Sequence, residues 1–211
     1  MVYYSLLFGS ITNIFDYLTS PIITYGMGII IYLLLDMNKN NRSLKEKIME
    51  VLKLGFLWLA GYGLTWISKW ILTDVIYGKH IISSAIGEIF FRLGNTINYG
   101  YDETFKITPL LSLFRNIIQI IIPFATLINI NIIISIVSYK KIDKEKLYNL
   151  LPFAIISILP VMKYIIVVNQ SYQHAIFTYR ELFLTILSML LYGYFVIDKK
   201  SLKEKKRSDE S

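Results

Sequence analysis

The sequence predicts an all-α, polytopic transmembrane helix bundle of about five spans, and three observations carry this prediction. Of the 211 residues, 55% are hydrophobic, and the mean hydropathy is +0.51, which is too apolar for an ordinary soluble domain. The apolar residues are gathered in runs of roughly 20, the length at which a helix crosses a bilayer. The 22 lysines and arginines lie mainly between these runs.

Five stretches approach the length of a spanning helix, and they cover residues 15–35, 54–76, 117–137, 147–168 and 175–197. A shorter apolar stretch, residues 3–14, fits an interfacial helix, one half of a helical hairpin or the remnant of an earlier span, so six spans are the alternative. We therefore expect one transmembrane domain over residues 1–197. Residues 198–211 are rich in charge and are expected to form a disordered cytoplasmic tail.

The long segment between the second and third spans contains the sequence HIISSAIGEIFFRLGN. Its apolar residues recur at helical spacing and leave Ser84, Glu88 and Arg92 on the opposite side. Gly94 and Asn95 suit a helix C-terminus. This pattern predicts one external amphipathic helix that lies at the membrane interface.

The distribution of basic residues predicts the orientation. Residues 36–53 contain five lysines and arginines, residues 139–146 contain four, and the tail from residue 198 contains six. Cytoplasmic loops are enriched in Lys and Arg, so we expect a multi-pass protein of the cell membrane with its C-terminus in the cytoplasm and its N-terminus outside. An external N-terminus without a signal sequence suggests that the chain is the C-terminal part of a longer protein.

Composition also excludes several classes of function. The formal net charge is +7, but the basic residues alternate with apolar runs, which disfavours nucleic-acid binding. There is no cysteine and there are only two histidines, so we expect neither a disulfide framework nor a metal site built from these residues.

Ionisable residues inside apolar runs are informative, because each costs about 2.5 to 3.5 kcal/mol on insertion scales. In this sequence they fall toward the predicted outer ends of the spans, at Asp16, Lys69, Arg115, Lys163, Arg180 and Glu181. The four cations, Lys69, Lys163, Arg180 and Arg115, are our candidates for binding the phosphate of a lipid headgroup. The alternative is that these side chains extend from helix ends to the nearest interface.

The segment NQSYQHAIFTYR, residues 169–180, is the densest polar cluster outside the predicted cytoplasmic loops. It supplies four candidate substrate-binding residues, and two tryptophans flank Lys69; the set is Asn169, Tyr172, His174, Tyr179, Trp66 and Trp70. An aromatic belt at the interface explains the same residues without a ligand. Ser171 and His174 lack an orienting acid and a nucleophile elbow, which disfavours a hydrolase triad.

Asp16 precedes Pro21 at the entry to the first span. A carboxylate there is suited to act as a general base or to hold a divalent cation, and is equally suited to cap the following helix. Asp16 is therefore the candidate catalytic residue, and a divalent cation is the candidate cofactor.

Three segments, FGSITNIFDYLTSPIITYG, GYGLTWISKW and VNQSYQHAIFTYR, resemble bacterial membrane proteins that are similar to the C-terminal half of GT-C-type glycosyltransferases. The resemblance implies a polyprenyl-phosphate-linked sugar as substrate, chemistry at the outer face, and phosphate contacts from Lys69, Lys163 and Arg180. Enzymes of this class place a catalytic acid in their first external loop, and this chain begins after that region. The resemblance therefore implies that Asp16 replaces that acid or that a partner supplies the N-terminal half.

Our leading hypothesis is a glycosyltransferase-like membrane protein, or a fragment of one, that handles a lipid-phosphate-linked sugar for envelope polymers. A small transporter or flippase-like module is one alternative. A non-catalytic membrane subunit is the other.

Overall fold

The protein is built almost entirely of helices, as the sequence predicts. The structure is a computed structural model that describes residues 2–15, 20–37, 42–78, 81–98, 104–140 and 142–197. In chain order the elements are α1 (Val2–Phe15), α2 (Pro21–Asp36), α3 (Leu44–Tyr77), α4 (Ile81–Leu93), β1 (Thr96–Asn98), β2 (Thr104–Lys106), α5 (Pro109–Lys140), α6 (Lys144–Asn149), α7 (Leu151–Ile166), α8 (Val168–Gln173), α9 (Ala175–Thr178), the 3₁₀ helix η1 (Tyr179–Glu181) and α10 (Leu182–Val196). The all-α class is confirmed, and the two strands in the described part of the chain form a small antiparallel hairpin in which Thr96 pairs with Lys106.

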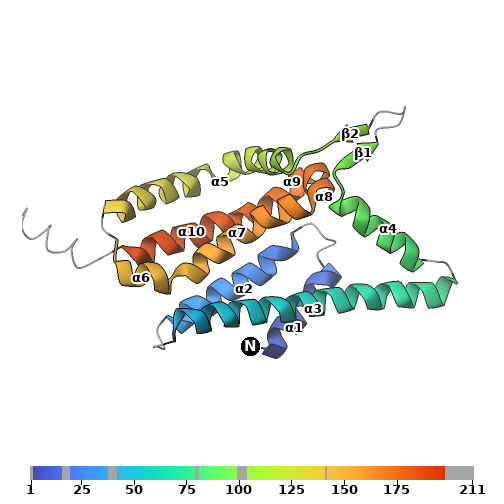
Figure 1. Ribbon diagram of the computed structural model, residues 1–211, viewed down its shortest axis with the longest axis horizontal. Coiled ribbons are helices and arrows are strands. Elements are labelled where there is room, and N and C mark those ends of the chain that lie inside the picture. The colour runs from blue at the N-terminus through green and yellow to red at the C-terminus, as the bar shows by residue number, and fades with distance from the viewer. Residues whose placement is uncertain are drawn as a thin grey trace, which may run out of the picture.

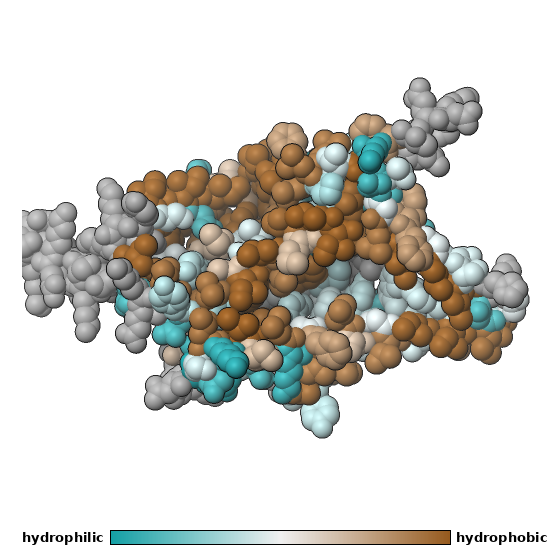
Figure 2. Space-filling view, viewed as in Figure 1, coloured by the Kyte–Doolittle hydropathy of each residue, from teal (hydrophilic) through white to brown (hydrophobic). Residues whose placement is uncertain are grey.

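Five helices, α2, α3, α5, α7 and α10, run along the long axis of the molecule and pack against one another (Figure 1). The main core lies where α2, α3, α7 and α10 meet, and its buried side chains include Ile30, Leu54, Phe153, Ile156 and Leu184. Apolar residues also cover most of the surface that is visible in Figure 2. A bundle that is apolar both inside and outside is what a lipid environment requires.

Three helical segments are long and apolar enough to cross a membrane: Leu44–Tyr77, Pro109–Ile136 and Ala175–Val196. Two further apolar helices, α2 and α7, have 16 residues each. At 1.5 Å per residue each is about 24 Å long, less than the roughly 30 Å of a hydrocarbon core. The membrane class therefore agrees with the sequence, while three spans rather than five meet the length criterion in the described chain.

Helix α3 begins ten residues before the span predicted at 54–76, because a capping box starts it. The Ser43 hydroxyl accepts a hydrogen bond from the Glu46 backbone N–H, and the Glu46 carboxylate accepts one from the Ser43 N–H. This reciprocal pair satisfies two backbone donors that would otherwise lack partners. The helix ends at Gly78, whose φ of 60° is the left-handed conformation that glycine adopts readily.

Helix α1 crosses α3 at very close range, so the short apolar stretch at residues 3–14 packs against a long helix of the bundle. A Cβ atom on Gly9 would lie 2.0 Å from the Trp58 carbonyl oxygen, and one on Gly61 would lie 2.0 Å from the Leu6 carbonyl oxygen. Next to this crossing the Ser5 hydroxyl donates to the Leu54 carbonyl oxygen at 2.6 Å. Small residues that allow two backbones to touch are typical of helix contacts in membranes.

Helix α4 bridges two parts of the bundle, reaching from the C-terminal end of α3 to α8 (Figure 1). The Asp74 carboxylate in α3 accepts a hydrogen bond from the first N–H of α4, at Ile81, over 2.6 Å. The Gly94 N–H donates to the Phe90 carbonyl oxygen and ends the helix where the sequence predicts. A helix therefore exists where the sequence predicts the amphipathic one, and the Asp74 carboxylate ties its first turn to α3.

The α1–α3 crossing yields a stability prediction with a control on the same helix. We expect Gly61→Ala to destabilise the purified protein by about 1 to 3 kcal/mol, because its methyl group has no space against the Leu6 carbonyl. Gly63→Ala, where nothing lies within 4 Å, should instead stabilise α3 by up to about 1 kcal/mol. Thermal unfolding followed by tryptophan fluorescence measures both. Equal effects of the two substitutions would contradict the crossing.

Candidate functional site

A groove between α1, α3 and α4 brings predicted site residues together. It has a volume of about 350 Å³ and is lined by Asn13, Trp66, Lys69, Trp70, Ala85, Glu88 and Arg92. Three of the residues singled out from the sequence, Lys69, Trp66 and Trp70, therefore share one concave surface. We call this surface the α1–α3–α4 groove.

Lys69 is held by a single buried residue of α1. Its ammonium group donates to both the backbone carbonyl oxygen and the side-chain oxygen of Asn13, each at 2.8 Å. Asn13 is only 3% exposed, and its own amide donates to the Tyr62 carbonyl oxygen of α3 at 3.0 Å. An ammonium group has three donors, and Lys69 is exposed and forms no ion pair with a described residue. Its position is thus fixed while its charge stays available.

A row of aromatic side chains runs along one face of α3 and ends in this groove. Trp58, Tyr62, Trp66 and Trp70 follow one another at four-residue spacing, so they share one face of the helix. The ring centroids of Trp66 and Trp70 lie 5.0 Å apart in an edge-to-face arrangement, and those of Trp58 and Tyr62 lie 5.2 Å apart. Flat apolar rings beside a cation are suited to contact the face of a sugar or a prenyl chain.

Arg92 is a second cation of the groove, and sequence reasoning did not select it as a site residue. Its guanidinium donates to Glu88 at 2.8 Å and to the Gln170 side chain at 3.0 Å. The polar side of the amphipathic helix was visible in the sequence, but the pattern alone does not say which helix that side faces. In the structure it faces Lys69 and the tryptophans.

Asn169, predicted to bind substrate, fastens α4 to α8. Its side-chain amide donates to the Phe91 carbonyl oxygen at 2.7 Å and to the Thr96 carbonyl oxygen at 2.9 Å. The residue is 1% exposed. Asn169 therefore supports the groove through α4 and does not line it.

Lys163, predicted to bind phosphate, is paired inside the bundle. Its ammonium group lies 2.7 Å from the Glu181 carboxylate, and the two side chains are 9% and 0% exposed. A buried cation with a carboxylate this close is already neutralised, whereas Lys69 is not. The structure thus separates the two lysines that the sequence placed in one patch, because Lys163 does not line the α1–α3–α4 groove.

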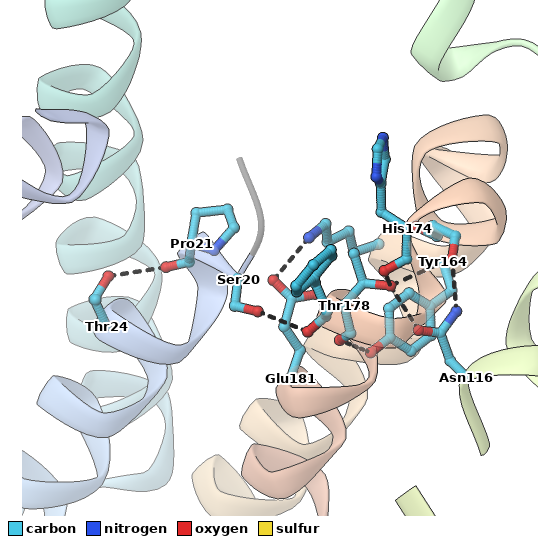
Figure 3. Close-up of polar contacts among 11 residues, drawn as sticks. Ser20, Pro21, Thr24, Asn116, Tyr164, His174, Thr178 and Glu181 are labelled. Atoms are coloured by element: carbon cyan, nitrogen blue, oxygen red, sulfur yellow. Dashed lines mark hydrogen bonds and ion pairs between the residues drawn. The ribbon is translucent and has the colours of Figure 1, made fainter. Parts of the chain in front are cut away.

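A separate buried polar network lies beside this ion pair (Figure 3). The Tyr164 hydroxyl donates to the Thr178 carbonyl oxygen at 2.7 Å, and the Thr178 hydroxyl donates to the Asn116 side-chain oxygen at 2.6 Å. The Asn116 amide in turn donates to the Ser171 carbonyl oxygen at 2.9 Å. These bonds connect α5, α7, α8 and α9 and so fix the positions of these four helices relative to one another.

The remaining predicted residues lie around this network. The Arg115 guanidinium carbon lies 4.3 Å from the centre of the Tyr172 ring, and that of Arg180 lies 5.8 Å from the Phe177 ring. The His174 side chain is exposed and points away from the network (Figure 3). Tyr179 is half-buried and packs against the cluster of Ile120, Tyr164 and Leu182. None of these residues lines the α1–α3–α4 groove.

Asp16, the candidate general base, lies outside the described residues, as does the predicted tail at 198–211. Among the residues that the structure describes, no three His, Asp or Glu side chains come together to form a metal site. The acid that the structure does place in the groove is Glu88.

Comparisons of the chain with protein-family models, with curated proteins and with solved structures found no match. The resemblance to GT-C-type glycosyltransferases therefore remains a prediction from the sequence segments, and the groove geometry is the independent basis for a functional proposal.

The buried ion pair yields a stability prediction that tests the structural role of Lys163. We expect Glu181→Gln to destabilise the protein by about 3 to 5 kcal/mol, because it leaves the Lys163 charge buried without a counter-charge. The double variant Lys163→Met, Glu181→Leu should recover most of that loss. Chemical unfolding in detergent micelles measures both variants.

The exposed pair on α4 is the matched control for this experiment. Glu88→Gln removes the partner of Arg92 near the surface, where screening limits the effect to about 0.5 kcal/mol. A Glu181→Gln variant as stable as Glu88→Gln would show that Lys163 does not depend on its carboxylate partner.

Proposed function

We propose that this chain is an integral membrane protein that binds the phosphate of a lipid-linked sugar in the α1–α3–α4 groove and serves envelope glycan synthesis as a GT-C-type glycosyltransferase or part of one. The observation that carries the proposal is Lys69. Its ammonium group is positioned by buried Asn13, is not neutralised by a described carboxylate, and faces a concave surface with two tryptophans.

The charges of the groove suit a monoanionic or dianionic headgroup. Lys69 and Arg92 contribute two positive charges and Glu88 one negative charge, so the lining carries a net charge of about +1. Arg offers paired donors to phosphate oxygens, and Lys offers a compact charge. A phosphate bound there would be held by Lys69 and by the guanidinium N–H groups of Arg92 that its two protein partners do not use.

The topology proposed from the sequence supports an external groove. The β-bridge between Ile142 and Ile197 places the start of α6 beside the end of α10, at the end of the bundle where α2 ends and α3 begins (Figure 1). Helix α4 lies at the other end of α3 (Figure 1). The groove is lined by α4 and by Trp66, Lys69 and Trp70 in the C-terminal half of α3. If basic connections face the cytoplasm, as the charge rule states, the C-terminus is inside and the groove opens to the outer face. Under this proposal α2 and α7 complete five spans.

In the proposed transfer an acceptor hydroxyl oxygen bonds to the anomeric carbon of the sugar while the bond from that carbon to the lipid phosphate oxygen breaks. A carboxylate takes the hydroxyl proton, and Lys69 and Arg92 stabilise the charge on the departing phosphate. Asp16 is the carboxylate proposed from the sequence, and Glu88 is the one that lines the groove.

A non-catalytic subunit is the second candidate, and one observation favours it. Helix α5 turns uncharged polar side chains outward from the bundle, including the exposed amides Gln119 and Asn129. Such groups are typical of surfaces that a further membrane helix covers.

Headgroup binding is the first test of the proposal. We expect detergent-purified protein to bind a short prenyl phosphate such as citronellyl phosphate, measured by isothermal titration calorimetry. Lys69→Ala and Arg92→Ala should each weaken binding by roughly tenfold or more, because each removes a charge-assisted hydrogen bond worth about 1.5 to 3 kcal/mol.

Lys106→Ala is the matched control, since Lys106 is an exposed cation on β2 that does not line the groove. It should bind like the wild type. Wild-type protein that binds no prenyl phosphate, or equal losses in Lys69→Ala and Lys106→Ala, would overturn the proposed site.

A further inference from the structure

A second concave surface, with a volume of about 310 Å³, lies between α1, α2 and α3 and shares no lining residue with the α1–α3–α4 groove. We call it the α1–α2–α3 pocket. All three helices line it, with side chains that include Phe8, Tyr25, Ile29, Leu54 and Trp58. Gly28 also lines it, and a Cβ atom on Gly28 would meet nothing within 4 Å. The pocket is therefore open down to the backbone of α2.

The hydroxyl groups in this lining are already used within the chain. The Ser5 and Tyr25 hydroxyls donate to backbone carbonyl oxygens of α3 at 2.6 and 2.8 Å, and the Thr24 hydroxyl donates to its own helix at 2.8 Å. None of these three hydrogens is left to donate to a ligand. The surface that faces the pocket is thus mainly hydrocarbon and aromatic, which favours an apolar occupant.

The pocket is long and narrow. Its lining residues on α2 run from Thr24 to Leu35, which corresponds to about 16 Å along the axis, close to half of the roughly 30 Å hydrocarbon core. Spread over this length, 310 Å³ gives a mean cross-section of about 20 Å², whereas a helix 10 Å across occupies about 80 Å². The pocket therefore has room for one hydrocarbon chain and excludes the helix of a partner protein.

The rim of the pocket shows where such a chain enters. Tyr4 and Phe8 of α1 and Ile31 and Leu35 of α2 line the pocket and are between 54% and 63% exposed. These side chains are apolar or aromatic, so the pocket opens sideways onto a surface that suits the membrane interior. A lipid already in the bilayer reaches the pocket without crossing water.

One end of the pocket leads to a charged surface. Tyr32 lines the pocket, and its hydroxyl accepts a hydrogen bond from the Arg42 guanidinium at 2.6 Å. Arg42 in turn lines a shallow hollow over the first turns of α3, which we call the α3 hollow and which is lined by Arg42, Glu46, Met49, Glu50 and Lys53. Two cations and two carboxylates balance there, and Asp36 lies a further 3.6 Å from Arg42. An anionic headgroup is therefore disfavoured, and a headgroup that carries both charges is favoured.

We propose that the chain binds one zwitterionic aminophospholipid, of the phosphatidylethanolamine class, with an acyl chain in the α1–α2–α3 pocket and its headgroup in the α3 hollow. The Arg42 guanidinium donates to the phosphate oxygens through N–H groups that Tyr32 does not use. The carboxylates of Glu46 and Glu50 accept hydrogen bonds from the ammonium group, which a choline headgroup cannot donate. The inference does not depend on the ligand of the α1–α3–α4 groove.

Tryptophan quenching tests the acyl-chain site, because Trp58 lines the pocket. The chain has three tryptophans, so Trp66→Phe and Trp70→Phe leave Trp58 as the only reporter. We expect phosphatidylethanolamine with brominated acyl chains to quench this parent protein saturably in detergent micelles. Gly28→Leu should abolish the quenching, because its side chain fills the pocket.

Gly63→Leu is the matched control, since Gly63 also has nothing within 4 Å but does not line the pocket. It should be quenched like the parent protein. No saturable quenching of the parent, or the same response in both glycine variants, would overturn the acyl-chain site. Competitive relief of quenching by citronellyl phosphate would assign the pocket to a prenyl chain and overturn the phospholipid as its occupant.

The headgroup assignment is tested with the same reporter and does not depend on Gly28. Phosphatidylethanolamine should bind about tenfold more tightly than phosphatidylcholine or phosphatidylglycerol with the same brominated chains, and Arg42→Ala should remove roughly tenfold in affinity. Lys45→Ala is the control, since Lys45 is an exposed cation that lines neither the pocket nor the hollow. Equal affinities for the three lipids, or equal losses in Arg42→Ala and Lys45→Ala, would overturn the assignment.

Discussion

The buried ion pair between Lys163 and Glu181 constrains much of the described molecule. Its two charges lie inside an apolar bundle, where neither is stable alone, so α7 and η1 must meet at one relative position. The bond from Tyr164 to the Thr178 carbonyl fixes the same contact a second time. Through Asn116 the network then reaches α8. Asn169 of α8 holds α4 in place. The shape of the groove therefore depends on the polar bonds that position α8, although none of these bonds lies in the groove itself.

The groove itself is assembled from three helices that come from distant parts of the chain. Asn13 belongs to α1, Lys69 to α3 and Arg92 to α4, and each reaches its place through a separate contact. The close crossing at Gly9 and Gly61 brings Asn13 to Lys69. Any ligand of Lys69 is therefore coupled to backbone packing about two turns away on α3. This explains why the short helix α1 is part of the candidate site.

Helix α5 carries the same residue type in two different environments. Asn131 satisfies its amide within the chain, while Asn129, two residues earlier, points away from it. The kink at Phe124, where φ is −117° and ψ is 15°, follows Pro123, because a proline inside a helix removes a backbone hydrogen bond. Pro152, in contrast, lies in the first turn of α7, where the missing N–H costs nothing, so it starts a helix and does not bend one.

The sequence by itself determined the helical membrane class, the approximate position of each long helix and the amphipathic α4, because apolar length and helical periodicity are local properties of the chain. It also selected Lys69, Trp66 and Trp70, which lie within five residues and share one side of a helix. Only the tertiary structure decided that Lys163 is neutralised by Glu181, that Asn169 supports α4, and that Arg92 joins Lys69. These outcomes depend on which side chains meet across helices, and the position of a charged residue in a sequence does not indicate which residue pairs with it.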